Sequence, residues 1–185
     1  MRVIAGTFRS RQLKSLKGLA LRPTSDRLRE TLFNVLGAAV GGSRFLDLFA
    51  GTGAIGIEAV SRGAASVVLV ENHAPAVRLI RENIASLEIS SHTRVISGDV
   101  SASLAALARE KAPPFDFVFL DPPYALEQQY ELVLGVLAES ALIAEESIVV
   151  AEHRKSVTLA AVFGRLQRVR ELRQGDAALS FYRLA

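Results

Sequence analysis

The chain has 185 residues, of which 50% are hydrophobic, and its mean hydropathy is +0.27. These values are typical of one well-filled globular domain. The longest run without a charged residue, residues 31–43, is too short and too glycine-rich to cross a bilayer, and no apolar stretch precedes the charges of the N-terminus. We therefore expect neither a membrane-spanning helix nor a signal peptide.

The numbers of cysteines and histidines limit the kinds of metal and catalytic site that the chain can contain. The chain has no cysteine, which excludes disulfides, thiolate metal sites and cysteine nucleophiles, and we expect a cytoplasmic protein. Its three histidines, His73, His92 and His153, are not at metal-ligand spacing, so we expect no metal site. We also expect a monomer.

Charge is distributed unevenly. Residues 1–30 carry eight basic and two acidic side chains, residues 31–150 carry seven and 14, and residues 151–185 carry seven and three. The balances are +6, −7 and +4. A net acidic body between two basic ends is typical of an enzyme core whose termini meet a polyanion, but also of two solvated surface segments, and charge alone does not separate these interpretations.

The first elements in chain order are a hairpin and a helix. Residues 2–6 and 11–13 alternate apolar and polar side chains around a Thr-Phe-Arg-Ser turn, which predicts a short basic β-hairpin. The run Arg-Pro-Thr-Ser-Asp at residues 22–26 provides a stop and an N-cap. Apolar residues from Leu28 to Ala39 then recur at helical spacing, which predicts one amphipathic helix.

Short apolar runs and helical segments alternate from residue 44 onward. The predicted strands cover residues 45–49, 66–70, 93–97, 115–120 and 147–151. The predicted helices between them cover residues 54–62, 74–87, 101–111 and 127–138. This alternation predicts βαβ crossovers and a parallel sheet covered on both faces. Two extended segments, residues 165–173 and 177–184, joined by Gln-Gly-Asp, predict a closing antiparallel hairpin.

Ligands of doubly wound sheets bind at the carboxyl ends of the strands, and the first motif lies there. Residues 47–56, Asp-Leu-Phe-Ala-Gly-Thr-Gly-Ala-Ile-Gly, form a strand-to-helix turn. Gly51 and Gly53 let the backbone approach a ligand, and Gly56 lets the helix pack closely on the strand. Glu71 ends the next strand, where its carboxylate can accept hydrogen bonds from two ribose hydroxyls. Together these features predict a cofactor that contains adenosine.

Asp47 indicates which cofactor this is. A carboxylate so close to the glycines would repel the pyrophosphate of NAD(P) by about 1 kcal/mol or more at contact range. It would attract the ammonium group of S-adenosylmethionine. Asp47 therefore favours the methyl donor, although a carboxylate here can also organise the turn by accepting hydrogen bonds from its N–H groups.

The second motif is Asp121-Pro122-Pro123-Tyr124, which follows an apolar strand. Two prolines stiffen the loop, so the Asp121 carboxylate and the Pro122 carbonyl form two fixed acceptors for the hydrogens of an exocyclic amine. Such an amine is a poor nucleophile, and this contact orients its lone pair toward the methyl group. Tyr124 can stack on the target base. An ordinary Pro-Pro turn with a surface tyrosine is the alternative for this motif taken alone.

Taken together, these motifs resemble those of a known family. The Asp-Pro-Pro-Tyr motif with the glycine turn is similar to amino-directed S-adenosylmethionine-dependent nucleic-acid methyltransferases. Four segments, with Arg9 and Arg11, resemble the ribosomal small-subunit methyltransferase D (RsmD) family more narrowly: residues 2–6, 22–33, 47–59 and 175–182. The resemblance implies a Rossmann-like class I methyltransferase fold, with a mostly parallel seven-stranded sheet ending in an antiparallel hairpin. It also implies methylation of the N2 amine of one guanine in 16S rRNA, on an assembled or nearly assembled 30S subunit.

The resemblance also implies roles for individual residues. Asp121, Pro122 and Tyr124 would be catalytic. Donor binding would fall to Asp47, Gly51, Gly53, Glu71 and Asp99. Asp99 can equally be the N-cap of the following helix. We expect residues 1–22 to be an RNA-contacting appendage of a methyltransferase domain at 23–185. The cations expected to grip rRNA phosphates are Arg2, Arg9, Arg11 and Lys14.

Other functions stay open from the sequence. An adenine-N6 methyltransferase acting on DNA or RNA would use the same Asp-Pro-Pro-Tyr motif. An NAD(P)-dependent oxidoreductase would explain the glycines and Glu71 but leaves that motif without a role. A non-catalytic RNA-binding assembly factor is the third alternative. Arg27 and Glu30 on the leading helix can cover the cofactor or lie on the surface, and His153 receives no role.

Overall fold

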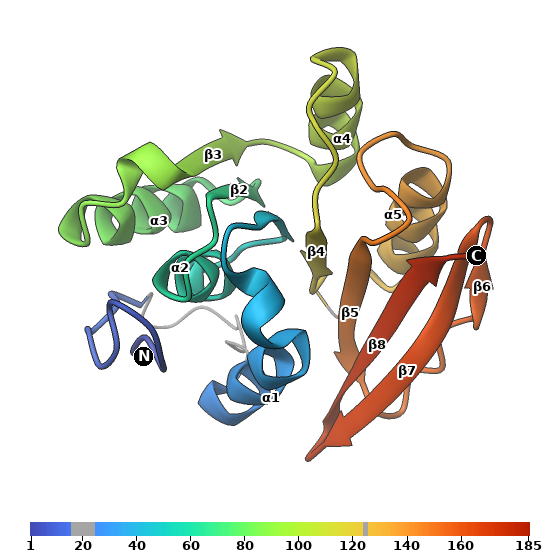
Figure 1. Ribbon diagram of the computed structural model, residues 1–185, viewed down its shortest axis with the longest axis horizontal. Coiled ribbons are helices and arrows are strands. Elements are labelled where there is room, and N and C mark those ends of the chain that lie inside the picture. Colours follow the sequence, from blue (N-terminus) through green and yellow to red (C-terminus); the bar gives the residue numbers. More distant parts are fainter. Residues whose placement is uncertain (16–24, 124–125) are drawn as a thin grey trace.

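The computed structural model describes residues 1–15, 25–123 and 126–185, and its centre is a mixed β-sheet (Figure 1). Within these ranges the sheet has eight strands in the order β3-β2-β1-β4-β5-β8-β7-β6. The strands are β1 (Arg44–Leu48), β2 (Ser66–Glu71), β3 (Thr93–Ser97), β4 (Phe117–Leu120), β5 (Ile148–Arg154), β6 (Val162–Phe163), β7 (Leu166–Gln174) and β8 (Ala177–Leu184). The α-helices are α1 (Asp26–Leu36), α2 (Ala54–Ser61), α3 (Ala74–Ser86), α4 (Val100–Arg109) and α5 (Gln128–Ala138).

Strands β3, β2, β1, β4 and β5 run parallel, whereas β8, β7 and β6 are antiparallel to their neighbours. This confirms the predicted parallel core and its closing antiparallel strands. The sequence predicted seven strands, and the additional one is β6, which pairs with β7 at the sheet edge. A strand of two residues is too short to show the alternation by which strands are recognised.

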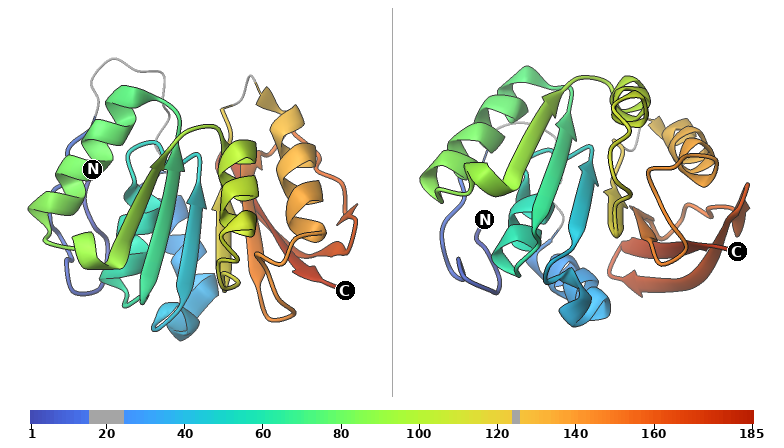
Figure 2. Two further views of the ribbon diagram at one scale, coloured as in Figure 1. Left: turned by 90° about the horizontal axis from the view of Figure 1, so that it is seen from above. Right: turned by 45° about the horizontal axis from the view of Figure 1, so that its top comes forward.

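Helices cover both faces of the parallel part of the sheet (Figure 2). Side chains of α1, α2 and α3 pack in one core cluster, and those of α4 and α5 pack in the other. The central parallel strands therefore have two buried faces, which is why β4 reads as a continuous apolar run, whereas the edge strand β3 contains no buried residue. Among the described residues, no helix has the length and apolar character needed to cross a membrane.

Helix α1 begins where the sequence predicts a cap. The hydroxyl of Ser25 accepts a hydrogen bond from the backbone N–H of Leu28 at 3.1 Å, which satisfies one of the free donors at the helix start. The helix ends at Leu36, and a 3₁₀ turn, Gly37–Val40, carries the chain to β1. The predicted helix is therefore confirmed, with its last residues wound more tightly.

The N-terminal segment does not form the predicted β-hairpin. Its two sides meet in an isolated antiparallel bridge between Arg2 and Gln12, and one further backbone hydrogen bond runs from the Ser10 N–H to the Val3 carbonyl oxygen at 2.9 Å. Two or three alternating residues on each side are too few for a ladder, and the segment is held instead by Val3 and Leu13, which are buried in the core shared with α1 and α2. The domain boundary predicted after residue 22 lies outside the described residues.

A buried ion pair anchors this segment to the helices. Arg29 of α1 and Glu58 of α2 have fully buried side chains, and the Arg29 Nε atom lies 3.8 Å from Glu58 Oε2. The Glu58 carboxylate also accepts hydrogen bonds from the backbone N–H groups of Ile4 and Ala5 at 2.8 and 3.0 Å. The Arg29 Nη2 atom donates to the carbonyl oxygen of Arg2 at 2.6 Å. Because buried charges require partners, this pair fixes the path of the N-terminal residues.

Candidate functional site

The carboxyl ends of four parallel strands bring acidic side chains together. Leu48 of β1 pairs with both Val70 of β2 and Leu120 of β4, and Leu120 pairs with Ala151 of β5. These strands therefore end at nearly the same height. The acidic residues at this edge are Asp47, Glu71, Asp121 and Glu152. We call these four residues the acidic edge.

The glycine turn between β1 and α2 leaves space on one side and packs tightly on the other. Gly51 and Gly53 have φ angles of +56° and +76°, which side-chain-bearing residues rarely adopt. A Cβ on Gly51 would meet no atom closer than 3.9 Å, so the backbone is accessible there. A Cβ on Gly56 would lie 2.8 Å from Leu69 Cδ2, so the absence of a side chain lets α2 pack closely against β2.

Asp47 organises this turn. Its Oδ2 atom accepts a hydrogen bond from the Gly56 N–H at 2.9 Å, and the residue is only 1% exposed. Burial raises the pKa of the Asp47 carboxyl to about 7, and the charge of Glu71 adds to the increase while the Gly56 hydrogen bond opposes it. The turn-organising contact proposed from the sequence is thus present, and donor binding by Asp47 stays a prediction.

Glu71 joins the glycine turn to the next turn. Its Oε2 atom accepts from the Gly51 N–H at 2.7 Å, and its Oε1 atom accepts from the His73 N–H at 2.7 Å. Each carboxylate oxygen has two lone pairs. Both oxygens of Glu71 can therefore accept a further hydrogen bond, as the predicted ribose contact requires.

Asp99 caps helix α4. Its Oδ1 atom accepts hydrogen bonds from the N–H groups of Ser101 and Ala102 at 2.9 and 3.1 Å. The neighbouring Gly98 N–H donates to the carbonyl oxygen of Glu71 at 3.0 Å and ties the end of β3 to β2. The capping interpretation is confirmed, and the contact to adenine stays a prediction.

The Asp-Pro-Pro-Tyr motif starts directly after β4. Asp121 is partly exposed and Pro122 is buried. Desolvation raises the pKa of the Asp121 carboxyl well above its ordinary value, and the charges of Glu152 and Asp47 raise it further. Tyr124 lies outside the described residues.

Glu152 is the site residue that the sequence analysis missed. It is 5% exposed, and its backbone carbonyl accepts a hydrogen bond from the hydroxyl of Tyr130 at 2.7 Å. Its position after a run of apolar residues near the carboxyl end of its strand is the signal that identifies it. The next residue, His153, is structural: its Nε2 atom lies 2.9 Å from Ser180 Oγ, and burial lowers its pKa.

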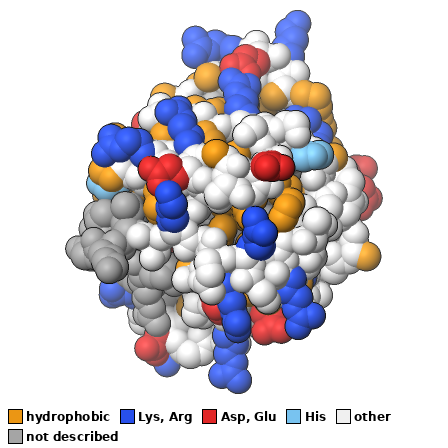
Figure 3. Space-filling model, turned by 90° about the vertical axis from the view of Figure 1, so that its left-hand side faces the viewer, with side chains coloured by type: hydrophobic (Ala, Val, Ile, Leu, Met, Phe, Trp, Pro, Cys, Tyr) orange, Lys and Arg blue, Asp and Glu red, His pale blue; other side chains and the backbone are white. Residues whose placement is uncertain are grey.

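The predicted RNA-binding residues lie apart from the acidic edge, on the N-terminal segment. Arg2, Arg9 and Arg11 are exposed, whereas the Lys14 ammonium group forms an ion pair with Glu82 at 2.9 Å. Figure 3 shows basic side chains scattered over the side of the molecule that carries this segment.

A groove of about 590 Å³ separates the N-terminal segment from α1. Its charged lining consists of Arg2, Arg9, Asp26, Arg27, Glu30 and Arg62. Arg27 and Glu30 are therefore surface residues of this groove. The Met1 Sδ atom lies 3.7 Å from the hydroxyl of Thr52, so the segment reaches the glycine turn.

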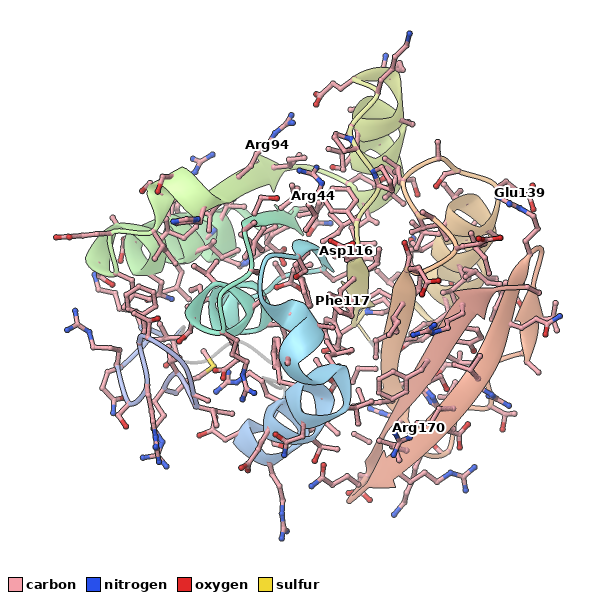
Figure 4. All side chains as sticks on the ribbon, viewed as in Figure 1. Arg44, Arg94, Asp116, Phe117, Glu139 and Arg170 are labelled. Atoms are coloured by element: carbon pink, nitrogen blue, oxygen red, sulfur yellow. The ribbon has the colours of Figure 1, made fainter. Side chains whose placement is uncertain are left out.

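A second, smaller hollow lies at the opposite end of the strands. Its volume is about 240 Å³, and Arg44 and Arg94 are among its lining residues. Arg44 and Asp116 mark this edge in Figure 4, and the Arg44 N–H donates to Asp116 Oδ2 at 2.7 Å. The sequence places no site residue here, and none of the acidic-edge residues lines this hollow.

Comparison with known proteins relates the whole chain to one family. The family described as "Conserved hypothetical protein 95" matches residues 1–183. The chain is 37% identical to YlbH of Bacillus subtilis over 183 residues, which are 99% of this chain and 98% of that protein. It is 34% identical to ribosomal RNA small subunit methyltransferase D of Escherichia coli over 182 residues, which are 98% of this chain and 89% of that protein.

Solved structures agree with this relationship. The Escherichia coli protein yhhF superposes with a TM-score of 0.87 at 32% identity, covering 100% of this chain and 98% of that chain. An RNA methyltransferase from Salinibacter ruber in complex with S-adenosyl-L-homocysteine superposes with a TM-score of 0.65 at 18% identity, covering 88% and 93%, and shares the fold. The chain therefore belongs to the RsmD family of S-adenosylmethionine-dependent methyltransferases.

Proposed function

We propose that this protein transfers a methyl group from S-adenosylmethionine to the exocyclic N2 amine of one guanine in 16S rRNA. The substrate would be the 30S subunit, assembled or late in assembly, and the protein would act as a cytoplasmic monomer. The observation that carries the proposal is the acidic edge, where Asp121 follows β4 beside the glycine turn. The relatives named as small-subunit rRNA methyltransferases support the choice of RNA.

The donor set at this edge fits a cationic cofactor. Glu71 accepts a hydrogen bond from the Gly51 N–H and Asp47 accepts one from the Gly56 N–H, so both carboxylates border the glycine turn, where they would attract an ammonium group and accept from ribose hydroxyls. A pyrophosphate at the same place would be repelled by the negative charge of these carboxylates and could not supply the cation that favours ionised Asp47, which argues against the NAD(P)-dependent oxidoreductase. Asp99 would contact the adenine edge from the end of β3.

The reaction needs an oriented amine. S-adenosylmethionine, when bound, supplies a methyl carbon activated by the neighbouring sulfonium charge. The Asp121 carboxylate and the Pro122 carbonyl would accept the two amine hydrogens and aim the nitrogen lone pair at that carbon. Tyr124 would stack on the base and hold it there. No strong general base is needed, because the attacked carbon is already activated.

The N-terminal segment is suitably placed to hold RNA near this site. Met1 contacts Thr52 in the glycine turn, and the Lys14 carbonyl accepts a hydrogen bond from Asn83 Nδ2 at 3.2 Å. The segment is thus attached beside the donor site. We assign the phosphate contacts to the exposed Arg2, Arg9 and Arg11. Lys14 would have to exchange its partner Glu82 for a phosphate.

The test is transfer of a labelled methyl group from S-adenosylmethionine to 30S particles purified from cells that lack the endogenous enzyme. Free 16S rRNA and duplex DNA serve as parallel substrates, and digestion identifies the methylated base. Asp121→Ala removes one of the two amine acceptors. Asp116→Ala, a change of the same type at the amino end of β4, is the matched control.

We expect label on a guanine N2 of the 30S particle, loss of transfer in Asp121→Ala, and retained transfer in Asp116→Ala. Label on adenine N6 would overturn the assignment of the base. Tight donor binding without transfer to any substrate would favour the RNA-binding assembly factor instead.

A further inference from the structure

We propose that Glu152 determines base specificity by accepting a hydrogen bond from the N1–H group of the target guanine. This inference rests on the guanine-N2 reaction proposed above and adds a residue that chooses the base. Asp121 and Pro122 would hold the reacting amine, and a carboxylate beside them can accept a hydrogen bond from the N1–H group, which is next to that amine on the guanine ring.

The register of the sheet places Glu152 next to Asp121. Leu120 of β4 pairs with Ala151 of β5, so the residues that follow them lie side by side. Neighbouring strands are about 4.8 Å apart. Phe119 and Val150 pair two residues earlier and both belong to the core cluster under α1 and α2. Because side chains alternate along a strand, Glu152 lies on that same face.

Electrostatics agree with this placement. The charge of Glu152 contributes to raising the pKa of the Asp121 carboxyl, second only to desolvation, and Asp47 contributes next. The two carboxyl groups therefore lie within electrostatic reach of each other. Carboxyl groups gathered at one edge of the sheet suit a ligand that presents hydrogen-bond donors or positive charge.

The position of Glu152 is also fixed from the opposite face of the sheet. The hydroxyl of Tyr130 on α5 donates to the Glu152 carbonyl oxygen at 2.7 Å, and Tyr130 is 3% exposed. On its other side, Glu152 pairs with Leu179 of β8. The backbone that carries this carboxylate is therefore held by three elements, which suits a residue that must read a hydrogen-bond pattern.

The two purine amines differ in what lies beside them. Guanine presents N1–H next to its N2 amine, so two adjacent carboxylates meet an unbroken row of donors. Adenine presents an N1 lone pair next to its N6 amine. In the site that lone pair would face the Glu152 carboxylate, setting two acceptors against each other, which is strongly disfavoured.

The sharpest test uses 2-aminopurine, which keeps the reacting amine of guanine but has a lone pair at N1. We would compare kcat/KM on 30S particles reconstituted with guanine or 2-aminopurine at the target position. The wild-type protein should prefer guanine by about tenfold or more. In Glu152→Gln this preference should collapse to about twofold, because an amide can accept from N1–H or donate to an N1 lone pair.

The matched control is Glu146→Gln, which removes a carboxylate in the turn before β5, far along the strand from the site, and should retain the full preference. Glu152→Asp should retain most of the preference, because it keeps the carboxylate. Equal loss of activity on both bases in Glu152→Gln, or an unchanged preference, would overturn the proposal. Absence of guanine methylation by the wild-type protein would instead overturn the proposed function.

Discussion

At the scale of single residues, the burial of the Asp47 carboxyl group and its hydrogen bond to Gly56 have opposite effects on its pKa. Its hydrogen bond to the Gly56 N–H shapes the glycine turn, while its burial raises its pKa to about 7. Near neutral pH the folded protein therefore retains a proton there that the unfolded chain would release. A cationic donor favours the ionised form, so donor affinity should increase as pH rises through this range.

Replacing Asp47 by Asn should make folding less sensitive to pH. Because the folded-state pKa lies above the ordinary value of 3.8, the stability linked to this group is fully present below that value and is lost as pH rises toward about 7. Each pKa unit corresponds to about 1.4 kcal/mol. Urea denaturation at about pH 5 and about pH 8 should show a smaller fall in the free energy of unfolding for Asp47→Asn than for the wild-type protein. Equal falls would contradict this account.

At the scale of elements, close approach of α2 to β2 and attachment of the N-terminal segment to α1 and α2 build the surroundings of the site. The first depends on a missing side chain at Gly56, and the second on the buried pair Arg29 and Glu58. For each of these two features, a substitution that disrupts it can be compared with a control substitution of the same type elsewhere in the chain.

Gly56→Ala should destabilise the protein by about 1–3 kcal/mol, because its Cβ would lie 2.8 Å from Leu69 Cδ2 and force α2 away from β2. Gly135→Ala in α5 is the control, since its Cβ would meet no atom within 4 Å. There the gain in helix propensity should stabilise the protein by about 0.5–1 kcal/mol. Thermal and urea denaturation measure both effects, and destabilisation of equal size at the two positions would refute the packing argument.

Glu58→Gln should cost about 3–5 kcal/mol of stability, because it leaves the buried Arg29 charge without its partner on α2. It should also loosen the N-terminal segment, which would appear as faster proteolysis within residues 1–15. Glu82→Gln breaks only the exposed ion pair with Lys14 and should cost less than about 1 kcal/mol. If the two variants were equally stable, the buried pair would not be the anchor.

At the scale of the whole molecule, charge of opposite sign is divided between the body and the ends of the chain. The body between residues 31 and 150 has twice as many acidic as basic side chains, whereas residues 1–30 are strongly basic. A donor site built from carboxylates would by itself repel the RNA backbone. The basic N-terminal segment, which reaches the glycine turn through Met1, offsets this repulsion where the substrate must approach.

The double change Arg9→Ala and Arg11→Ala should weaken RNA binding and make it less dependent on salt. The slope of log affinity against log salt should become shallower by about 0.7 for each phosphate that the protein no longer neutralises. Donor affinity should stay the same, because neither side chain belongs to the acidic edge. Arg94→Ala with Arg109→Ala removes the same charge elsewhere and should leave the salt slope nearly unchanged. Filter binding over a salt series and calorimetry with the donor measure the two quantities, and a parallel loss of donor binding would indicate misfolding instead.

Much of this architecture is readable from local sequence. Each apolar strand and helix of the parallel core follows from residues adjacent in the chain, because burial on two faces requires continuous apolar runs. The glycine turn and the Asp-Pro-Pro-Tyr motif are also local, so Asp47, Glu71, Asp99 and Asp121 could be placed at one edge of the sheet from the order of strands and helices. The short strand β6 and the true form of the N-terminal segment could not, because both depend on what packs against them.

The sequence by itself determined the order of strands and helices, the chemistry of the glycine turn and the acceptors offered to an amine. Tertiary structure alone decided which distant groups meet. The register of β4 and β5 set Glu152 beside Asp121, the packing of α1 on α2 joined Arg29 to Glu58, and the fold paired Lys14 with Glu82. Such pairings depend on burial and on contacts between residues far apart in the chain, which no local pattern records.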